Sequence, residues 1–276
     1  MSTATSAAKL IPSNPAAVMV IRDVTPQITT FSTPFLRFSR IKFGGRGTLV
    51  ALKSGNLAVF SPTALTDEVK AKVNAKGTLK YIVAPDIEHH IYVSPWHAAY
   101  PDAEIIGPEG LPEKREGDSA TKGVKFAHVF QAKSKQDMRI TDEFDAEFDY
   151  EFVDSHSNKE LVFLHKPTRT MIEADFVFNL PATEQFSKSG VDATSGLLTR
   201  LFGGIMNTRG DMIWQKRFLW YGAAGKDRQG FKASLEKIQK WDYDRIIPCH
   251  GDVIETGGKK VVGELGKWFT DGQHKV

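Results

Sequence analysis

The chain of 276 residues has one cysteine, no long apolar run and almost no excess of charge. A single cysteine, Cys249, cannot build an internal disulfide framework, which favours a reducing, cytoplasmic location. No stretch approaches about 18 uninterrupted apolar residues, so we expect no membrane partner through a spanning segment. Lys and Arg number 36 against 33 Asp and Glu, without a dense basic run, so we expect no nucleic-acid partner. These patterns specify no oligomeric state.

The N-terminal stretch MSTATSAAKLIPSNPAA lacks the features of a targeting segment. It is rich in Ser, Ala, Thr and Pro, with one Lys and no Arg or acid. The basic-then-apolar order of a secretory signal and the arginines of an organellar transit peptide are both missing. We therefore predict a disordered or extended arm over residues 1–16 and a single domain over residues 17–276.

The remaining sequence contains two groups of β-like segments, each followed by helices. The first group has short apolar runs at 17–22, 28–32, 47–52, 57–60 and 81–84, with a helix at about 65–75. Residues 110–134 are charged and irregular. The second group has a predicted hairpin over 159–175, helices over 193–241, a strand within 243–252 and a helix over 258–269. The absence of repeats or composition breaks favours one α/β domain with sheets inside and helices outside.

Three predicted strands end in residues that commonly bind metals. The strand at 81–84 leads to Asp86, Glu88, His89 and His90, the strand before Asp175 ends in that carboxylate, and the last strand ends in His250. Residues at strand ends lie on loops that a rigid scaffold holds, where sites are usually built. Carboxylates and imidazoles are costly to desolvate unless they are paired or bound to a metal.

His156 lies in the loop before the predicted hairpin. Together with the residues at the strand ends, it predicts a site for zinc, iron or manganese. Each residue alone has another interpretation, since a loop histidine is commonly exposed or hydrogen-bonded and Asp175 could cap a turn. Four further histidines have no partner pattern and are expected to be structural or exposed: His97, His128, His165 and His274.

The order of these motifs resembles the metallo-β-lactamase fold superfamily over about residues 17–270. The phrases APDIEHH, HKPTRT and DYDRIIPCHGD resemble an uncharacterised branch of that superfamily with a degenerate first metal motif. The resemblance implies an α/β fold, a four-layer αββα sandwich, with metals at the edge where the two sheets meet.

The first motif departs from the H-x-H-x-D-H pattern of the superfamily. If its final histidine is His89, the motif reads Ala84, Asp86, Glu88, His89, and two histidines have been lost. If its final histidine is His90, the motif has no carboxylate. We prefer the first alignment because it keeps an acid–histidine pair.

The resemblance then implies six metal ligands in two pockets. The pocket near His156 would use Asp86, His156 and Asp175, and the pocket near His250 would use Glu88, His89, Asp175 and His250. The second set is nearly complete, so we expect one well-held metal and a second that is weak or absent. The expected cofactor is one or two divalent ions. Zinc is the first expectation, although exchanging imidazole for carboxylate favours iron or manganese.

The implied function is metal-dependent hydrolysis of a small organic ester, lactone or amide by a metal-activated water. Glu88 or Asp86 would orient that water or take its proton. Two alternatives remain: a non-catalytic metal- or ligand-binding member of the fold, and an iron-dependent oxidoreductase or lyase. The apolar run 201–221 is either a wall or lid for a small-molecule substrate or a core helix, and Cys249 is expected to pack as a small buried residue.

Overall fold

The computed structural model describes residues 12–272. Most of the predicted N-terminal arm, residues 1–16, lies outside this range, and its last two residues begin the short helix α2 (Pro15–Val18). None of the helices described is both long enough and apolar enough to cross a membrane.

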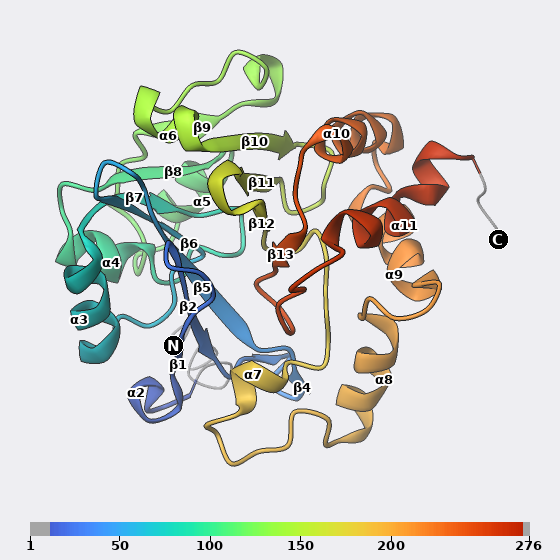
Figure 1. Ribbon diagram of the computed structural model, residues 1–276, viewed down its shortest axis with the longest axis horizontal. Helices are drawn as coiled ribbons and strands as arrows, with labels where there is room; N and C mark the ends of the chain where they lie inside the picture. The colour runs from blue at the N-terminus through green and yellow to red at the C-terminus, as the bar shows by residue number, and fades with distance from the viewer. Residues whose placement is uncertain (1–11, 273–276) are drawn as a thin grey trace.

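The first sheet contains the N-terminal strands (Figure 1). In spatial order, the strands described are β1 (Val20–Asp23), β2 (Ile28–Thr33), β5 (Gly45–Ala51), β6 (Asn56–Phe60), β7 (Thr78–Val83), β8 (Glu104–Pro108) and β9 (His128–Phe130). The pairs from β1 to β6 are antiparallel, and those from β6 to β9 are parallel. All six residues of β2 are buried, as expected for a strand covered on both faces.

The second sheet contains β10 (Phe148–Val153), β11 (Glu160–His165), β12 (Thr170–Ile172) and β13 (Arg245–Ile247). The predicted hairpin over 159–175 is present as β11 and β12, which pair antiparallel around a turn at Lys166–Thr168. β12 then pairs parallel with β13. A separate small hairpin joins β3 (Leu36–Arg37) to β4 (Ile41–Lys42).

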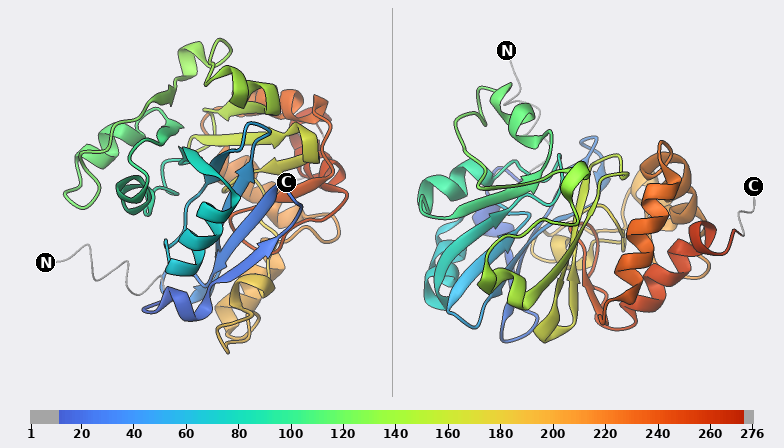
Figure 2. Two further views of the ribbon diagram at one scale, coloured as in Figure 1. Left: turned by 60° about the vertical axis from the view of Figure 1, so that its left-hand side comes forward. Right: turned by 90° about the horizontal axis from the view of Figure 1, so that it is seen from above.

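Helices cover the outer faces of both sheets (Figures 1 and 2). On the first sheet these are α3 (Asp67–Lys76), α4 (Val93–Ala99) and α5 (Leu111–Glu116), and on the second α10 (Arg228–Lys240) and α11 (Gly258–Thr270). Aromatic side chains such as Phe60, Phe144 and Phe163 fill the space between the sheets. The fold is therefore the predicted αββα sandwich. The other helices are α6 (Asp142–Glu147), α7 (Thr183–Phe186), α8 (Leu197–Ile205) and α9 (Ile213–Arg217).

The helical pattern of the sequence explains how the outer layers form. α10 buries one stripe of apolar side chains at helical spacing, with Phe231, Leu235 and Ile238 each at most 2% exposed. Burying one such side chain contributes roughly 1.5–3 kcal/mol. The prediction of an irregular segment over 110–134 was wrong, because α5 and β9 both lie within it. β9 has three residues, too few to produce a recognisable alternation.

Candidate metal centre

Four strand ends meet at one edge of the sandwich. β12 and β13 are parallel, and β10 runs the same way because both β10 and β12 are antiparallel to β11. The loop after β7 reaches this edge from the first sheet. Two main-chain hydrogen bonds join the loops, from Ile87 N to Asn158 O (3.0 Å) and from Leu161 N to Pro85 O (2.6 Å). The backbone thus places residues 85–90, 156–160, 173–175 and 249–250 together.

Three side chains from these loops converge. His89 Nε2 lies 3.1 Å from His250 Nε2, which lies 3.4 Å from Asp175 Oδ1. Two donors bound to one tetrahedral ion at about 2.05 Å lie about 3.3 Å apart, close to each of these two separations. The donor atoms of His89, Cys249 and His250 lie within 4.8 Å of one another, as do those of Asp86, His89 and Asp175. The side chains of His89, Asp175 and His250 are 10–14% exposed, which leaves the centre open to small molecules.

Hydrogen bonds occupy the outward-facing atoms of these three side chains. His89 Nδ1 lies 2.9 Å from Asp86 Oδ2, His250 Nδ1 donates to the Gly44 carbonyl oxygen (2.6 Å), and Asn158 Nδ2 donates to Asp175 Oδ2 (2.6 Å). Each contact fixes a ring or carboxylate so that its other donor atom faces the centre. Metal ligands in proteins are commonly oriented in this way.

The charges around the centre favour a cation. Asp86, Glu160 and Glu173 are at most 2% exposed, close to Asp175. Burial raises the pKa of Glu160 and of Glu173 well above the ordinary value. Burial opposes a charge on His89, but the nearby acidic groups, with Asp86 first and Asp175 adding to it, together raise the pKa of His89 well above 6.5. The surroundings of His89 therefore stabilise a positive charge, which is carried by a proton here and could be carried by a metal ion.

Two other histidines at this edge stay neutral. Burial lowers the pKa of His250 to about 4, and burial also lowers the pKa of His156. His156 Nδ1 accepts from the Asn158 N–H (3.2 Å), so the neutral ring carries its proton on Nε2. Within residues 12–272, that buried Nε2 has no hydrogen-bond partner.

The structure gathers most of the predicted ligands but not Glu88. Asp86, His89, Asp175 and His250 lie together, and the charges of Asp86 and Asp175 both act on His156. Glu88 points away, because its carboxylate is 46% exposed and accepts from Lys114 Nζ (2.8 Å).

Asp86 is placed differently from the prediction for a ligand or catalytic base. Its Oδ1 accepts the N–H groups of Glu88 (2.7 Å) and His89 (2.6 Å), and its Oδ2 contacts the His89 ring. Burial opposes ionisation, but His89 and these N–H groups keep the pKa of Asp86 below its ordinary value. Asp86 therefore holds His89 in place. His90 turns toward Arg115, whose Nη1 lies 3.1 Å from His90 Nδ1. Of these two neighbours, the structure brings His89 to the centre.

The structure places Cys249, the neighbour of His250 in the sequence, beside the centre. Cys249 is buried, as expected, at 5% exposed. Its sulfur and the ring nitrogens of His89 and His250 all lie within 4.8 Å of one another. The thiol donates to the Arg46 carbonyl oxygen (3.2 Å). The only signal in the sequence was that Cys249 precedes His250.

A family model described as a domain of unknown function, DUF4336, matches residues 39–188. This match covers more than half of the chain. The chain belongs to the DUF4336 family. The matched residues include the first motif, His156 and Asp175, and they end before His250. No curated protein matches the chain in sequence.

Solved structures similar to this DUF4336 chain share its fold. A metallo-β-lactamase from Pontibacter korlensis has a TM-score of 0.57 and 10% identity, covering 92% of this chain and 99% of that one. A metal-soaked Flv1 flavodiiron core from Synechocystis has a TM-score of 0.58 and 13% identity, over 92% and 62%. A flavoprotein from Thermotoga maritima has a TM-score of 0.56 and 12% identity, over 91% and 61%. The DUF4336 chain therefore has the metallo-β-lactamase fold.

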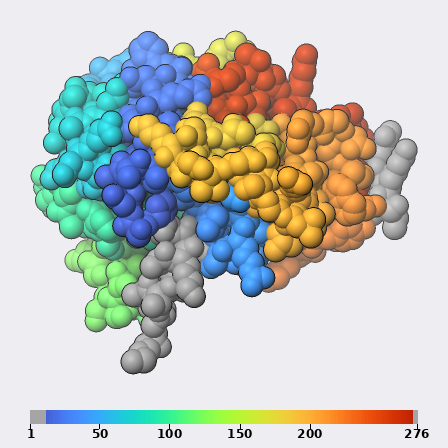
Figure 3. All heavy atoms as spheres, turned by 90° about the horizontal axis from the view of Figure 1, so that it is seen from below, coloured from blue at the N-terminus to red at the C-terminus, as the bar shows by residue number. Residues whose placement is uncertain are grey.

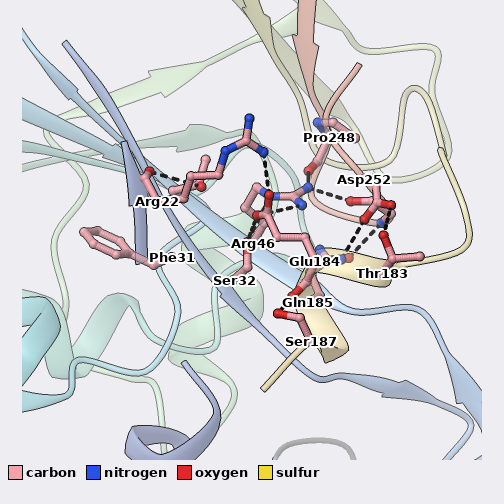
Figure 4. Close-up of polar contacts among 12 residues, drawn as sticks. Arg22, Phe31, Ser32, Arg46, Thr183, Glu184, Gln185, Ser187, Pro248 and Asp252 are labelled. Atoms are coloured by element: carbon pink, nitrogen blue, oxygen red, sulfur yellow. Dashed lines mark hydrogen bonds and ion pairs between the residues drawn. The ribbon is translucent and has the colours of Figure 1, made fainter. Parts of the chain in front are cut away.

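A buried arginine fixes the loop that carries His250 in this DUF4336 chain (Figure 4). Arg46 Nη1 donates to the carbonyl oxygens of Pro248 and Gly251, both at 2.7 Å. Burial lowers the pKa of Arg46, and the Glu184 carboxylate, 3.4 Å from its Nη2, opposes that shift. The loop conformation is thus set by a side chain from β5 in the other sheet.

Gln185 fixes the same loop from the opposite direction. Its Nε2 donates to the Cys249 carbonyl oxygen (2.8 Å), and its Oε1 accepts from the Gly251 N–H (3.1 Å). Gly44, whose carbonyl oxygen accepts from His250, packs directly on Gln185. A Cβ at Gly44 would lie 2.1 Å from Gln185 Oε1, and Gly44 has φ +69°, so this position requires glycine.

Aromatic rings surround His250 on the side away from His89. Phe178 stacks on the imidazole with ring centroids 5.9 Å apart, and Phe43 meets it edge-on at 5.5 Å. Phe202 of α8 contacts Phe43 at 6.0 Å. The apolar run over 201–221 therefore begins in a helix whose Phe202 reaches the His250 ring through Phe43.

Proposed function

We propose that this DUF4336 protein is a metal-dependent hydrolase of a small organic ester, lactone or amide. The observation that carries the proposal is that His250 Nε2 lies 3.1 Å from His89 Nε2 and 3.4 Å from Asp175 Oδ1, each close to the spacing of two donors on one ion. Their partial exposure supports access by a small substrate.

His89, Asp175 and His250 would hold the ion, and Cys249 is the nearest further donor. Two imidazoles with a carboxylate and a nearby thiol suit zinc better than manganese. When bound, a divalent ion supplies a Lewis acid and lowers the pKa of water to about 7. The rest of the site chemistry belongs to the side chains around it.

Each surrounding side chain has a distinct task in this proposal. Asp86 and Asn158 hold His89 and Asp175 in their orientations. Neutral His156 is buried beside Asp175 and would add no positive charge near the ion. The rings of Phe43 and Phe178 exclude water from one side of His250 and would contact the apolar part of the substrate.

The first experiment is to measure metals per chain by plasma mass spectrometry on protein purified without chelator or affinity nickel. We expect about one equivalent of zinc, and turnover of some members of an ester, lactone and amide panel. His89→Ala should lose the metal, whereas the neighbouring change His90→Ala should keep it. Metal retained in His89→Ala, or no metal after reconstitution, would exclude the proposed centre.

An iron-dependent oxidoreductase is the second candidate. Its support is the carboxylate in the first motif and the similarity of the fold to flavodiiron structures. Iron in the purified protein together with oxygen consumption would favour this candidate over the hydrolase. Metal bound without turnover of either kind would instead indicate the non-catalytic alternative.

A further inference from the structure

Large apolar side chains are exposed on two neighbouring elements, helix α8 and the β3–β4 hairpin. Four residues form what we call the α8 patch: Phe38 (68% exposed), Leu197 (84%), Leu198 (41%) and Leu201 (55%). Figure 3 views the face where the hairpin, in blue, lies beside α8, in yellow-orange. Hydrogen bonds join the two elements, from Lys42 N to Thr199 Oγ1 (3.3 Å) and from Lys42 Nζ to the Ser195 carbonyl oxygen (2.7 Å).

Packing within the fold does not account for the exposed leucines of α8. The inner face of this helix already packs, since Phe202 and Ile205 contact the apolar cluster that includes Phe43. Leu197 and Leu201 are four residues apart and therefore lie on one face. That face is exposed to solvent, so α8 is apolar on both sides.

The hairpin holds Phe38 in a conformation that an aromatic residue rarely adopts. Phe38 and Ser39 form the tip between β3 and β4, with φ of +51° and +58°. Asn-Gly is the usual choice for such a turn, because a side chain with a bulky Cβ substituent disfavours positive φ. A strained and exposed phenylalanine at a hairpin tip indicates a role outside the packed core.

Positive charge surrounds the α8 patch. Apart from the buried Arg46, the segments 34–48 and 185–210 contain six Lys or Arg and one acid, Asp192, whereas the whole chain has a formal charge of only +3. Arg37, Arg40 and Arg200 are exposed and form no ion pair with any residue between 12 and 272. The Asp192 carboxylate accepts from the hydroxyl and N–H of Thr194.

We propose that the α8 patch docks on the surface of an anionic lipid bilayer. The leucines and Phe38 would enter the boundary between headgroups and acyl chains, and Arg37, Arg40 and Arg200 would contact lipid phosphates. This combination of apolar side chains and flanking cations is what binding to an anionic membrane surface requires. A second copy of the chain fits less well, because a two-fold contact through this patch would bring like charges together.

This proposal departs from the expectation of no membrane partner, which rested on the lack of a spanning segment. Surface docking needs no such segment. It would also bring the metal centre close to lipid, because Phe35, just before β3, contacts His250 with ring centroids 5.9 Å apart. That last point rests on the proposed function, whereas docking itself does not.

The test is co-sedimentation of the full chain with vesicles of phosphatidylcholine, with and without an equal share of phosphatidylglycerol. We expect binding to the anionic vesicles only, weakened by salt. Each cation near an anionic surface contributes about a fivefold change in partitioning, so Arg37→Glu with Arg200→Glu should weaken binding by more than about 25-fold. Leu197→Ser with Leu201→Ser should reduce it to background.

The controls are Ile91→Ser and Arg139→Glu, which change exposed residues outside both elements of the patch and should bind like the unaltered protein. Absence of binding to anionic vesicles, or equal losses in the controls, would overturn the proposal. A dimer in light scattering that Leu197→Ser with Leu201→Ser converts to monomer, without vesicle binding, would assign the patch to a second copy. Because the readout does not depend on metal or turnover, its failure is separate from a failure of the proposed hydrolase.

Discussion

The two sides of the candidate centre use the same residue types, yet only one side is arranged to bind a metal. On the His250 side, the outward atoms of His89, Asp175 and His250 are hydrogen-bonded and the remaining atoms converge. On the His156 side, both carboxylate oxygens of Asp86 already form hydrogen bonds with His89. The Nδ1 atom of His156 accepts a hydrogen bond from the Asn158 N–H. A ligand set therefore depends on which atoms remain free, not only on which residues are present.

This difference explains why counting ligands by residue type misassigned Asp86 to the His156 side. Asp86 was counted with the His156 side, but its hydrogen bonds support His89 on the other side. Removing Asp86 from the first pocket leaves His156 and Asp175, which is too few for a structural ion. One well-held metal therefore stays a prediction, which the contacts on the His250 side now motivate.

The largest effect should come from removing ligands on the His250 side. His250→Ala and Asp175→Ala should each weaken metal affinity by more than the roughly 100-fold that the loss of an outer-shell partner costs. His156→Ala should have a much smaller effect on metal affinity. Competition titration against a chromophoric chelator measures all three, with His97→Ala as a control. Equal losses in His156→Ala and His250→Ala would remove the distinction between the two sides.

The next largest effect should come from the buried arginine that holds the His250 loop. Arg46→Met leaves the carbonyl oxygens of Pro248 and Gly251 without their donor. We expect metal affinity to fall by about 10–100-fold and the free energy of unfolding to fall by about 3–5 kcal/mol. Chemical denaturation of the metal-free protein measures the second quantity.

Arg169→Met is the matched control for Arg46→Met. Arg169 pairs with Asp242 on the surface, where the side chains are 55% and 78% exposed. An exposed pair contributes at most about 1 kcal/mol. If Arg46→Met were no more destabilising than Arg169→Met, the loop would not depend on the buried guanidinium.

A smaller effect should appear as a pH dependence of metal binding. Burial opposes a charge on His89, but Asp86 and the other acidic groups around it together raise the pKa of His89, so the metal-free protein holds a proton on this ring at neutral pH. The stability that this proton provides is complete below pH 6.5 and is lost as pH rises through the raised pKa. Because the metal must displace the proton, affinity should rise about tenfold per pH unit up to that pKa.

Calorimetry in two buffers with different ionisation enthalpies measures this proton release directly. We expect at least about one proton released per ion at pH 7, from His89 and from any water that the ion acidifies. His250 contributes none, because its pKa of about 4 leaves it neutral. No release at pH 7 would contradict the charged state of His89.

The smallest effect should come from Glu88→Gln. The Glu88 carboxylate is exposed and pairs with Lys114, so metal affinity should stay within about twofold of the unaltered protein. Lys114→Met removes the same contact from the other partner and should behave alike. A large loss of metal in Glu88→Gln alone would restore Glu88 to the centre.

The parts of the fold that the sequence predicted well are those with a local signal. The β11–β12 hairpin and the buried stripe of α10 follow from turn residues and periodicity, both of which are readable within about 20 residues. The β3–β4 hairpin was missed because its tip is Phe38-Ser39, which is not a recognised turn signal. Its strands have two residues each, too short to show alternation.

The sequence predicted which strand ends contribute residues to the site, but not how the side chains of those residues are oriented. That His89, and not His90, faces the centre is decided by Arg115, which is 25 positions away and contacts His90. The direction of Glu88 is decided by Lys114. The role of Arg46 depends on contacts across more than 200 positions, which no local pattern carries.

The distance along the chain between His89 and His250 has a consequence for kinetics. These residues are 161 positions apart and come from different sheets. Closing so long a loop has a high entropic cost, so the two rings meet only after both sheets have formed and docked. Metal capture would then be a late step in folding. The rate of metal uptake during refolding would report when the two halves of the sandwich have docked.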